Sequence, residues 1–238
     1  MGIDVNAAKV VTFNPGHERR VVTDPNRPVP STAFGDLHVV SVFRRRRVKH
    51  DEDDGNPLIY ALKRKFGYTI AASDLRQIVR AGHQILPAAL DGTSFDLVVP
   101  LPSSSPVASI LARRASRMAG GCDVVSCLDK ATVAQVLASA PHPDAIQQRD
   151  RRIFTSHLAT LQRLPGDSVI EMKTVPLRVR HHFTPIVANA LVDACAGRHI
   201  LLVDDIVGSG SSLVAAAAAL GVAGAGPTTA LTLLSRLS

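Results

Sequence analysis

The sequence predicts an α/β protein built on a doubly wound, mostly parallel sheet. Short apolar runs of strand length alternate with segments in which apolar residues recur at helical spacing. That alternation is typical of parallel strands joined by helices that cover both faces of the sheet. Two loops of small residues, 102–105 and 208–212, also follow apolar runs. In such sheets ligands bind beyond the carboxyl ends of the strands.

Composition limits the classes of protein that the chain can belong to. Its 238 residues are 46% hydrophobic and 20% charged, which is enough to bury a core without disulfides or structural metals. The net charge of +7 suits anionic ligands, whether phosphates or nucleic acid. Three scattered cysteines favour a reducing compartment. With no signal peptide or membrane span evident, we expect a cytoplasmic protein without membrane contact.

The N-terminal part is expected to lie outside the main sheet. Residues 1–36 are rich in Pro, Asn, Gly and charge, and they predict an extended or partly disordered arm. Residues 37–94 predict a small N-terminal helical cap. The elements expected in this cap are a strand over Leu37–Phe43, a helix that begins at Asn56-Pro57, and a helix from Ser73-Asp74 to Gly82.

A basic run, Arg44–Arg47 with Lys49, follows the first predicted strand and is answered at once by Asp51–Asp54. One interpretation is a solvated loop in which the two runs partly neutralise each other. The sharper alternative is a contact with nucleic acid through Arg44–Arg47.

The main domain is expected over residues 95–238, with an insertion at 140–183. The predicted strands are Phe95–Leu101, Cys122–Cys127, His199–Asp204 and Thr228–Leu234. The predicted helices run from Pro106 to Gly120, over Ala131–Ser139, from Thr184-Pro185 to Gly197, and over Ser212–Leu220. The insertion shows no clear core pattern, and long irregular segments are usually functional or mobile. Within it, Ser168–Met172 is expected as a strand and Lys173–His182 as its return.

The most informative segment is Leu201–Leu213, in which an apolar run ends in two carboxylates and a Gly/Ser loop. Asp204 and Asp205 are expected at the carboxyl end of a buried strand, where they can accept hydrogen bonds from the 2′- and 3′-hydroxyls of a ribose. The loop 208–212 leaves backbone N–H groups free to wrap a phosphate, and the next helix points its positive end at the same group. An ordinary strand-to-helix turn, capped by one Asp, is the alternative.

This segment resembles the phosphoribosyl pyrophosphate (PRPP) signature of type I phosphoribosyltransferases, an acidic pair and two apolar residues before a Thr/Ser-Gly-x-Thr/Ser loop. The positions that fit are Asp204, Asp205, Ile206, Val207, Ser209, Gly210 and Ser212. Gly208 departs from the pattern, because Thr, Ser or Ala is usual there, and one hydroxyl near the phosphate is lost. The resemblance implies that Asp204 and Asp205 fix the ribose and hold Mg²⁺ through water. It also implies that PRPP is bound by Val207, Gly208, Ser209, Gly210, Ser211 and Ser212.

The resemblance further implies a second loop, after the first core strand, that holds the pyrophosphate of PRPP. Here that loop is Pro102, Ser103, Ser104 and Ser105, just before a helix. A Ser-rich helix cap is the alternative interpretation. The family often has Lys or Arg in this loop, whereas this sequence has none until Arg113. The positive partners of pyrophosphate must therefore come from elsewhere.

The insertion is the expected source of those cations. In the family a mobile hood closes over PRPP, and its cationic side chains stabilise the departing pyrophosphate. By this resemblance Lys173, Arg178 and Arg180 are the leading catalytic candidates, together with Asp204 and Asp205. A set of solvated loop charges is the alternative.

A narrower resemblance is to the ComF-like competence proteins. Leu58–Lys63 followed by Gly67 is similar to the apolar-Lys-Gly segment ahead of their phosphoribosyl domain. Gln135 and the cluster Arg149–Arg152 are similar to the Gln and paired-Arg region of that branch. Those proteins usually begin with a four-cysteine zinc ribbon, and this sequence contains none. A role in DNA uptake therefore does not carry over.

The resemblance implies an enzyme that transfers the phosphoribosyl group of PRPP to a small nitrogen acceptor and releases pyrophosphate, with Mg²⁺. The sequence does not identify the acceptor. A second hypothesis is a PRPP-sensing or nucleic-acid-binding regulator that uses Arg44–Arg47, and a third is a structural partner of DNA processing with a vestigial site. Association as a homodimer is left open.

Overall fold

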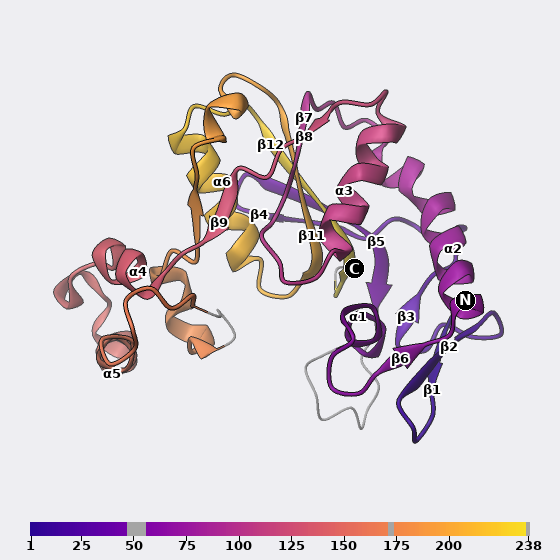
Figure 1. Ribbon diagram of the computed structural model, residues 1–238, viewed down its shortest axis with the longest axis horizontal. Coiled ribbons are helices and arrows are strands. Elements are labelled where there is room, and N and C mark those ends of the chain that lie inside the picture. The colour runs from indigo at the N-terminus through magenta and orange to yellow at the C-terminus, as the bar shows by residue number, and fades with distance from the viewer. Residues whose placement is uncertain (47–55, 171–173, 237–238) are drawn as a thin grey trace.

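A mixed sheet of seven strands forms the centre of the molecule, and helices lie on both of its faces (Figure 1). The computed structural model describes residues 1–46, 56–170 and 174–236. Five strands run parallel in the order β5-β12-β11-β7-β8, and β3 and β4 pair antiparallel with β5. The prediction of an α/β fold with a mostly parallel sheet is therefore confirmed. The strands are β3 (Val21–Val22), β4 (Ser31–Phe34), β5 (Leu37–Arg45), β7 (Leu97–Pro100), β8 (Asp123–Val124), β11 (Ile200–Val207) and β12 (Thr228–Ser235).

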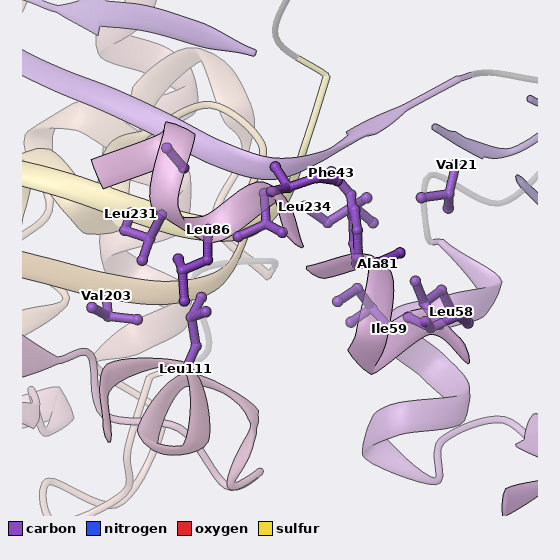
Figure 2. Close-up of a cluster of buried hydrophobic side chains, with 14 of the residues drawn as sticks. Val21, Phe43, Leu58, Ile59, Ala81, Leu86, Leu111, Val203, Leu231 and Leu234 are labelled. Atoms are coloured by element: carbon purple, nitrogen blue, oxygen red, sulfur yellow. The ribbon is translucent and has the colours of Figure 1, made fainter. Parts of the chain in front are cut away.

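Successive residues of the central strand β11 belong to two different hydrophobic clusters, one on each face of the sheet. Leu201 and Val203 pack with α2 and α3, and Figure 2 shows part of this cluster. Ile200 and Leu202 pack on the other side with α6. Because both faces are covered, the strand reads as a continuous apolar run rather than an alternating one. The helices are α2 (Ala72–Leu90), α3 (Val107–Met118) and α6 (Ser211–Val222).

The N-terminal residues 1–36 are folded into the protein, which corrects the prediction of an extended or partly disordered arm. β1 (Gly2–Val5) pairs antiparallel with β2 (Val10–Asn14), and β6 (Thr69–Ile70) joins β2 in parallel. Ile3 and Val11 are fully buried in the same cluster as α2. These strands are short and separated by turns, so their alternation is too brief to stand out in the sequence.

The boundary expected at residue 95 does not separate a cap from the sheet. β5 pairs in parallel with β12 and is therefore part of the central sheet. The helix α1 (Pro57–Lys63) begins as predicted, with the Asn56 side chain accepting a hydrogen bond from the Leu58 N–H at 2.9 Å. The helix α2 does not end at Gly82 but continues through it to Leu90.

Close packing explains why a glycine stands inside α2. A Cβ on Gly82 would lie 3.3 Å from Cζ of Phe43 on β5, which is tighter than nearly all real contacts. The missing side chain lets α2 approach the sheet, and the tertiary packing outweighs the poor helix propensity of glycine.

In the second half of the chain, the expected strands β7, β8, β11 and β12 and the expected helices α3 and α6 are present. The helix α4 (Val133–Ser139) is also present, and Thr132 and Gln135 cap it reciprocally. The helix predicted from Thr184-Pro185 to Gly197 is wrong. Its first part is the strand β10 (Ile186–Ala188), paired with β9 (Leu128–Lys130), and a 3₁₀ turn η4 (Val192–Cys195) follows. Branched Ile186 and Val187 suit a strand, and their helical spacing is coincidental.

Residues 131–170 and 174–183 form an outer lobe that Figure 1 shows set apart from the sheet. The lobe has a hydrophobic cluster of its own, in which the Phe154 and Phe183 rings stack with centroids 5.1 Å apart. The interpretation of 140–183 as a segment without a core is therefore wrong, because its apolar residues pack with one another rather than on the sheet. The lobe contains α4, η1 (Pro143–Ala145), α5 (Gln148–Leu161) and η3 (Leu177–His182).

The two strands predicted in the insertion are not formed within its described residues. The expected strand Ser168–Met172 is reduced to one isolated bridge between Val169 and Thr132, and its expected return contains the 3₁₀ helix η3. Residues 171–173 lie outside the described part of the chain. None of the helices in the described part combines the length and apolar character needed to cross a bilayer.

The central position of β11 gives a test of the fold. Leu202→Ala is expected to lower the free energy of unfolding by about 2–5 kcal/mol, because it leaves a cavity at a fully buried site. The matched control is Leu177→Ala, where the leucine is 67% exposed and the loss should stay below about 0.5 kcal/mol. Denaturant unfolding followed by circular dichroism measures both, and equal losses would contradict this placement of β11.

Candidate functional site

The two loops singled out in the sequence lie side by side at one edge of the sheet. β7 and β11 are adjacent and parallel, with Pro100 paired to Val203, and the Leu101 N–H donates to the Val203 carbonyl at 2.8 Å. From β7 the chain passes through α3 to β8, whereas from β11 it passes through α6 to β12 on the opposite side. This reversal opens a crevice between the carboxyl ends of β7 and β11, the usual place for a ligand in such a sheet.

The loop after β11 surrounds a pocket of about 150 Å³. Its lining comprises Asp204, residues 206–213 and Arg180 from η3 of the outer lobe. The helix α6 starts here with Gly210 as its N-cap, and no side chain caps it. The N–H groups of its first turn are therefore free of intrahelical and capping partners, and together with the helix dipole they favour an anion.

Gly210 is the one position in this loop that the backbone reserves for glycine. Its φ is +76°, and a Cβ there would lie 2.8 Å from three ring carbons of Phe34 on β4. Gly208, in contrast, has open space around it. The Ser209 and Ser211 hydroxyls are hydrogen-bonded to each other at 2.8 Å on the exposed side of the loop. Phe34 therefore braces the loop from a strand that the sequence interpretation had placed in a disordered arm.

The second loop, Pro102–Ser105, leads into α3, whose first turn also has no side-chain cap. The Ser105 N–H donates to Ser103 Oγ at 3.2 Å, and Ser103 and Ser104 are exposed. Ser105 is buried, and its hydroxyl has no hydrogen-bond partner among the described residues. A buried hydroxyl without a partner is costly, so this loop has an unfilled hydrogen-bonding position.

The two carboxylates of the motif have different surroundings. Asp205 is 2% exposed, and its Oδ2 is 2.5 Å from Nζ of Lys63 at the end of α1. Asp204 is half-buried, lines the phosphate-loop pocket, and accepts a hydrogen bond from the Asp205 N–H at 2.7 Å. The first carboxylate is therefore neutralised internally, and the second faces the space where a ligand would lie.

Asp204 has an unusual protonation equilibrium. Burial and the adjacent charge of Asp205 raise the pKa of Asp204 from 3.8 to about 7. The Asp205 N–H and the positive charges of Lys63 and Lys130 act in the opposite direction. Lys130 stands at the end of β9, so α1 and β9 both bring cations to the carboxylate pair. A perturbed carboxyl group at a crevice is characteristic of functional sites.

The cations expected in the insertion separate into three cases. Arg180 is brought to the site: it lines the phosphate-loop pocket, and its Nε and Nη2 donate to the Val175 carbonyl. Arg178 instead forms an ion pair with buried Asp150 on α5 and is held within the lobe. Lys173 lies outside the described residues.

The basic run Arg44–Arg47 lies at the end of β5, and its described members are partly neutralised. Arg46 Nη2 is 2.9 Å from Glu18 Oε2, and Arg27 binds the other oxygen of the same carboxylate at 2.6 Å. Arg47, Lys49 and Asp51–Asp54 are outside the described residues. The described residues favour an internal ion-pair cluster at Glu18 over an open basic face.

Sequence reasoning assigned no role to Lys63, Lys130 or Phe34. Lys63 had a signal, because it ends the apolar-Lys-Gly segment noted above, but its pairing with Asp205 joins positions 142 residues apart along the chain. Among the described residues, no three His, Cys, Asp or Glu side chains converge as a ready-made metal site. Any metal here would be held by the carboxylate pair together with water and substrate oxygens, which is the common way of binding Mg²⁺.

The loop geometry predicts that two neighbouring glycines respond differently to the same change. Gly210→Ala is expected to destabilise the protein by about 1–3 kcal/mol, through its left-handed backbone and the contact with Phe34. Gly208→Ala should change stability by less than about 0.5 kcal/mol, because its added methyl meets open space. Thermal unfolding of both variants provides the measurement. A Gly210→Ala protein as stable as the parent would rule out this loop conformation.

The raised pKa of Asp204 predicts a pH-dependent effect of replacing it. Between about pH 4 and pH 7 the unfolded chain releases this proton while the folded protein retains it, so the group's contribution to stability is lost as pH rises to about 7. Asp204→Asn should therefore have a higher Tm than the parent near pH 8, and the difference should vanish near pH 4. Calorimetry without divalent cations tests this, and an equal Tm difference at both pH values would contradict the pKa shift.

Comparison with known proteins adds no family to this geometry. No protein-family model matches the chain, and neither a curated protein nor a solved structure matches it. The chemistry of the site therefore has to be inferred from its own residues.

Proposed function

We propose that this protein binds PRPP with Mg²⁺ and transfers the phosphoribosyl group to a small nitrogen acceptor, releasing pyrophosphate. The observation that carries the proposal is the pair of uncapped helix starts, α3 and α6, at the crevice between β7 and β11. One anion-binding end would be enough for a simple phosphate. Two such ends beside a carboxylate pair match a ligand that carries phosphate groups on both sides of a sugar.

Each part of PRPP finds a chemically suitable group in the crevice. The 5-phosphate suits the loop 208–212, whose N–H groups surround the small pocket. The ribose hydroxyls suit Asp204, which lines the same pocket. The pyrophosphate suits Ser103–Ser105, where the unpartnered Ser105 hydroxyl is available as a donor.

Transfer is a displacement at ribose C1. A bond forms between the acceptor nitrogen and C1, the C1–oxygen bond to pyrophosphate breaks, and the electron pair leaves with pyrophosphate. The transition state has positive charge on the sugar and growing negative charge on the leaving group. The protein mainly positions these groups and neutralises the leaving charge. Arg180 and Lys130 are the described cations nearest to this task, since one lines the pocket and the other acts on Asp204.

The carboxylate pair fits a magnesium ion in one particular way. Lys63 already neutralises Asp205, which leaves Asp204 as the carboxylate that would hold Mg²⁺ through water. When bound, the ion would neutralise part of the pyrophosphate charge. Asp205 would then orient Asp204, because its N–H is hydrogen-bonded to Asp204 Oδ1.

A PRPP-sensing regulator is the second candidate. The observation that favours it is the pyrophosphate loop, which contains no Lys or Arg. Such a loop provides hydroxyl and N–H donors for binding but little charge to stabilise a leaving group. The regulator and the enzyme share the PRPP site and differ in turnover.

The decisive test measures pyrophosphate release from PRPP and Mg²⁺ across a panel of nucleobases and small amines. The parent protein is expected to release pyrophosphate only with a suitable acceptor, and Asp204→Asn to abolish that release. Arg180→Gln should lower kcat roughly tenfold or more, as loss of one charge-assisted contact to the leaving group does. The matched control is Arg152→Gln, an exposed arginine of α5, which should leave the rate unchanged.

A binding measurement on the same proteins distinguishes the outcomes. PRPP at 100 times its Kd stabilises the folded state by about 2.7 kcal/mol, which raises Tm by about 5–10 °C for a chain of this size. A PRPP-induced shift that Asp204→Asn removes, without release for any acceptor, would favour the regulator. Absence of both the shift and the release would overturn the proposal.

A further inference from the structure

The largest described pocket is not at the phosphate loops but beside the helices α2 and α3. Its volume is about 320 Å³, roughly twice that of the phosphate-loop pocket. The walls come from α1, α2, α3, β5 and β12. At about 30 Å³ for each water-sized group, it has room for a ligand of roughly ten non-hydrogen atoms.

The floor of this α2–α3 pocket is apolar. In α3, Val107, Ile110, Leu111 and Arg114 line it at spacings of three and four residues, so one helix face is turned toward it. Leu86 on α2 and Leu111 on α3 point toward each other across it (Figure 2). A cavity of this kind accepts the apolar body of a ligand and offers almost nothing to a wholly polar one.

Only two of the lining side chains are polar, Arg114 and His83, and they come from the two facing helices. Arg114 is half-buried, and among the described residues it has neither a hydrogen-bond nor an ion-pair partner. A guanidinium in this position can bind a carboxylate or phosphate through two parallel hydrogen bonds.

The charge around the pocket has one sign. No carboxylate is among the residues that line it. Four further exposed arginines stand on the same two helices, namely Arg76, Arg80, Arg113 and Arg117. The field at the pocket mouth therefore attracts anions and repels cations.

From this combination we infer that the α2–α3 pocket is a binding site for a small amphipathic anion, with its apolar body in the cavity and its carboxylate or phosphate head on Arg114. The site is independent of the PRPP proposal, because it shares no lining residue with the phosphate-loop pocket. Two of its walls nevertheless continue into the crevice: Leu62 precedes Lys63, and Pro106 follows Ser105. A ligand here would contact the segments that place Asp205 and the pyrophosphate loop.

Isothermal titration of the full chain with octanoate and with octyl phosphate tests the inference, and octanol serves as the uncharged probe. At least one of the two anions is expected to bind with one-to-one stoichiometry, and octanol at least tenfold more weakly. Arg114→Gln should weaken anion binding roughly tenfold or more, because a charge-assisted pair is lost. Arg113→Gln, the adjacent exposed arginine outside the pocket, should change the affinity less than twofold.

A cavity-filling variant makes the test specific for the pocket. Ile110 is 44% exposed at the wall, so Ile110→Trp can fill the space without a buried substitution, and it should abolish binding while Tm stays near that of the parent. Which of the two anions binds more tightly identifies the head group. Equal weakening by Arg113→Gln and Arg114→Gln, equal binding of octanol, or no binding of either anion at millimolar concentration would each overturn the inference.

Discussion

Asp205 is buried at the end of the central strand with Lys63 as its counter-ion, and a carboxylate at that depth requires one. An unpaired buried charge costs about 3–5 kcal/mol, a large fraction of the stability of an ordinary domain. The pair therefore fixes where α1 ends, and with it the position of the N-terminal segment against the sheet. It also leaves Asp204 as the carboxylate that faces the crevice, since the two neighbours cannot both be neutralised by the same lysine.

The same crevice concentrates features that oppose stability. Two helix starts lack side-chain caps, the Ser105 hydroxyl lacks a partner among the described residues, and Asp204 sits beside a like charge. Proteins tolerate such features mainly where a ligand satisfies them. The rest of the sheet offsets the cost, because strands β7 and β11 are fully buried between α3 and α6. The site is thus the part of the fold that sequence rules for stability alone do not explain.

Local patterns in the sequence predicted most of the doubly wound core and the phosphate loop, because β11, Gly210 and α6 follow one another along the chain. The strands β1 and β2 could not be predicted in the same way, since each is stabilised by partners distant in sequence. The strand β10 was taken for a helix because its pairing with β9 is invisible locally. Charge alone did not separate Arg180 from Arg178: what separates them is buried Asp150, which holds only the second.

The outer lobe decides how Arg180 reaches the phosphate loop. It has its own hydrophobic cluster, so Arg180 is carried on a packed unit rather than on an isolated loop. The strands β9 and β10 join that unit to the body, and β10 lies against α6, the helix that starts at Gly210. The loop and the arginine that faces it therefore depend on the same helix. Any ligand that draws the loop and Arg180 together acts through the β9–β10 pair, whose last residue before the lobe is Lys130. The third cation of the site thus stands at the connection between the two parts.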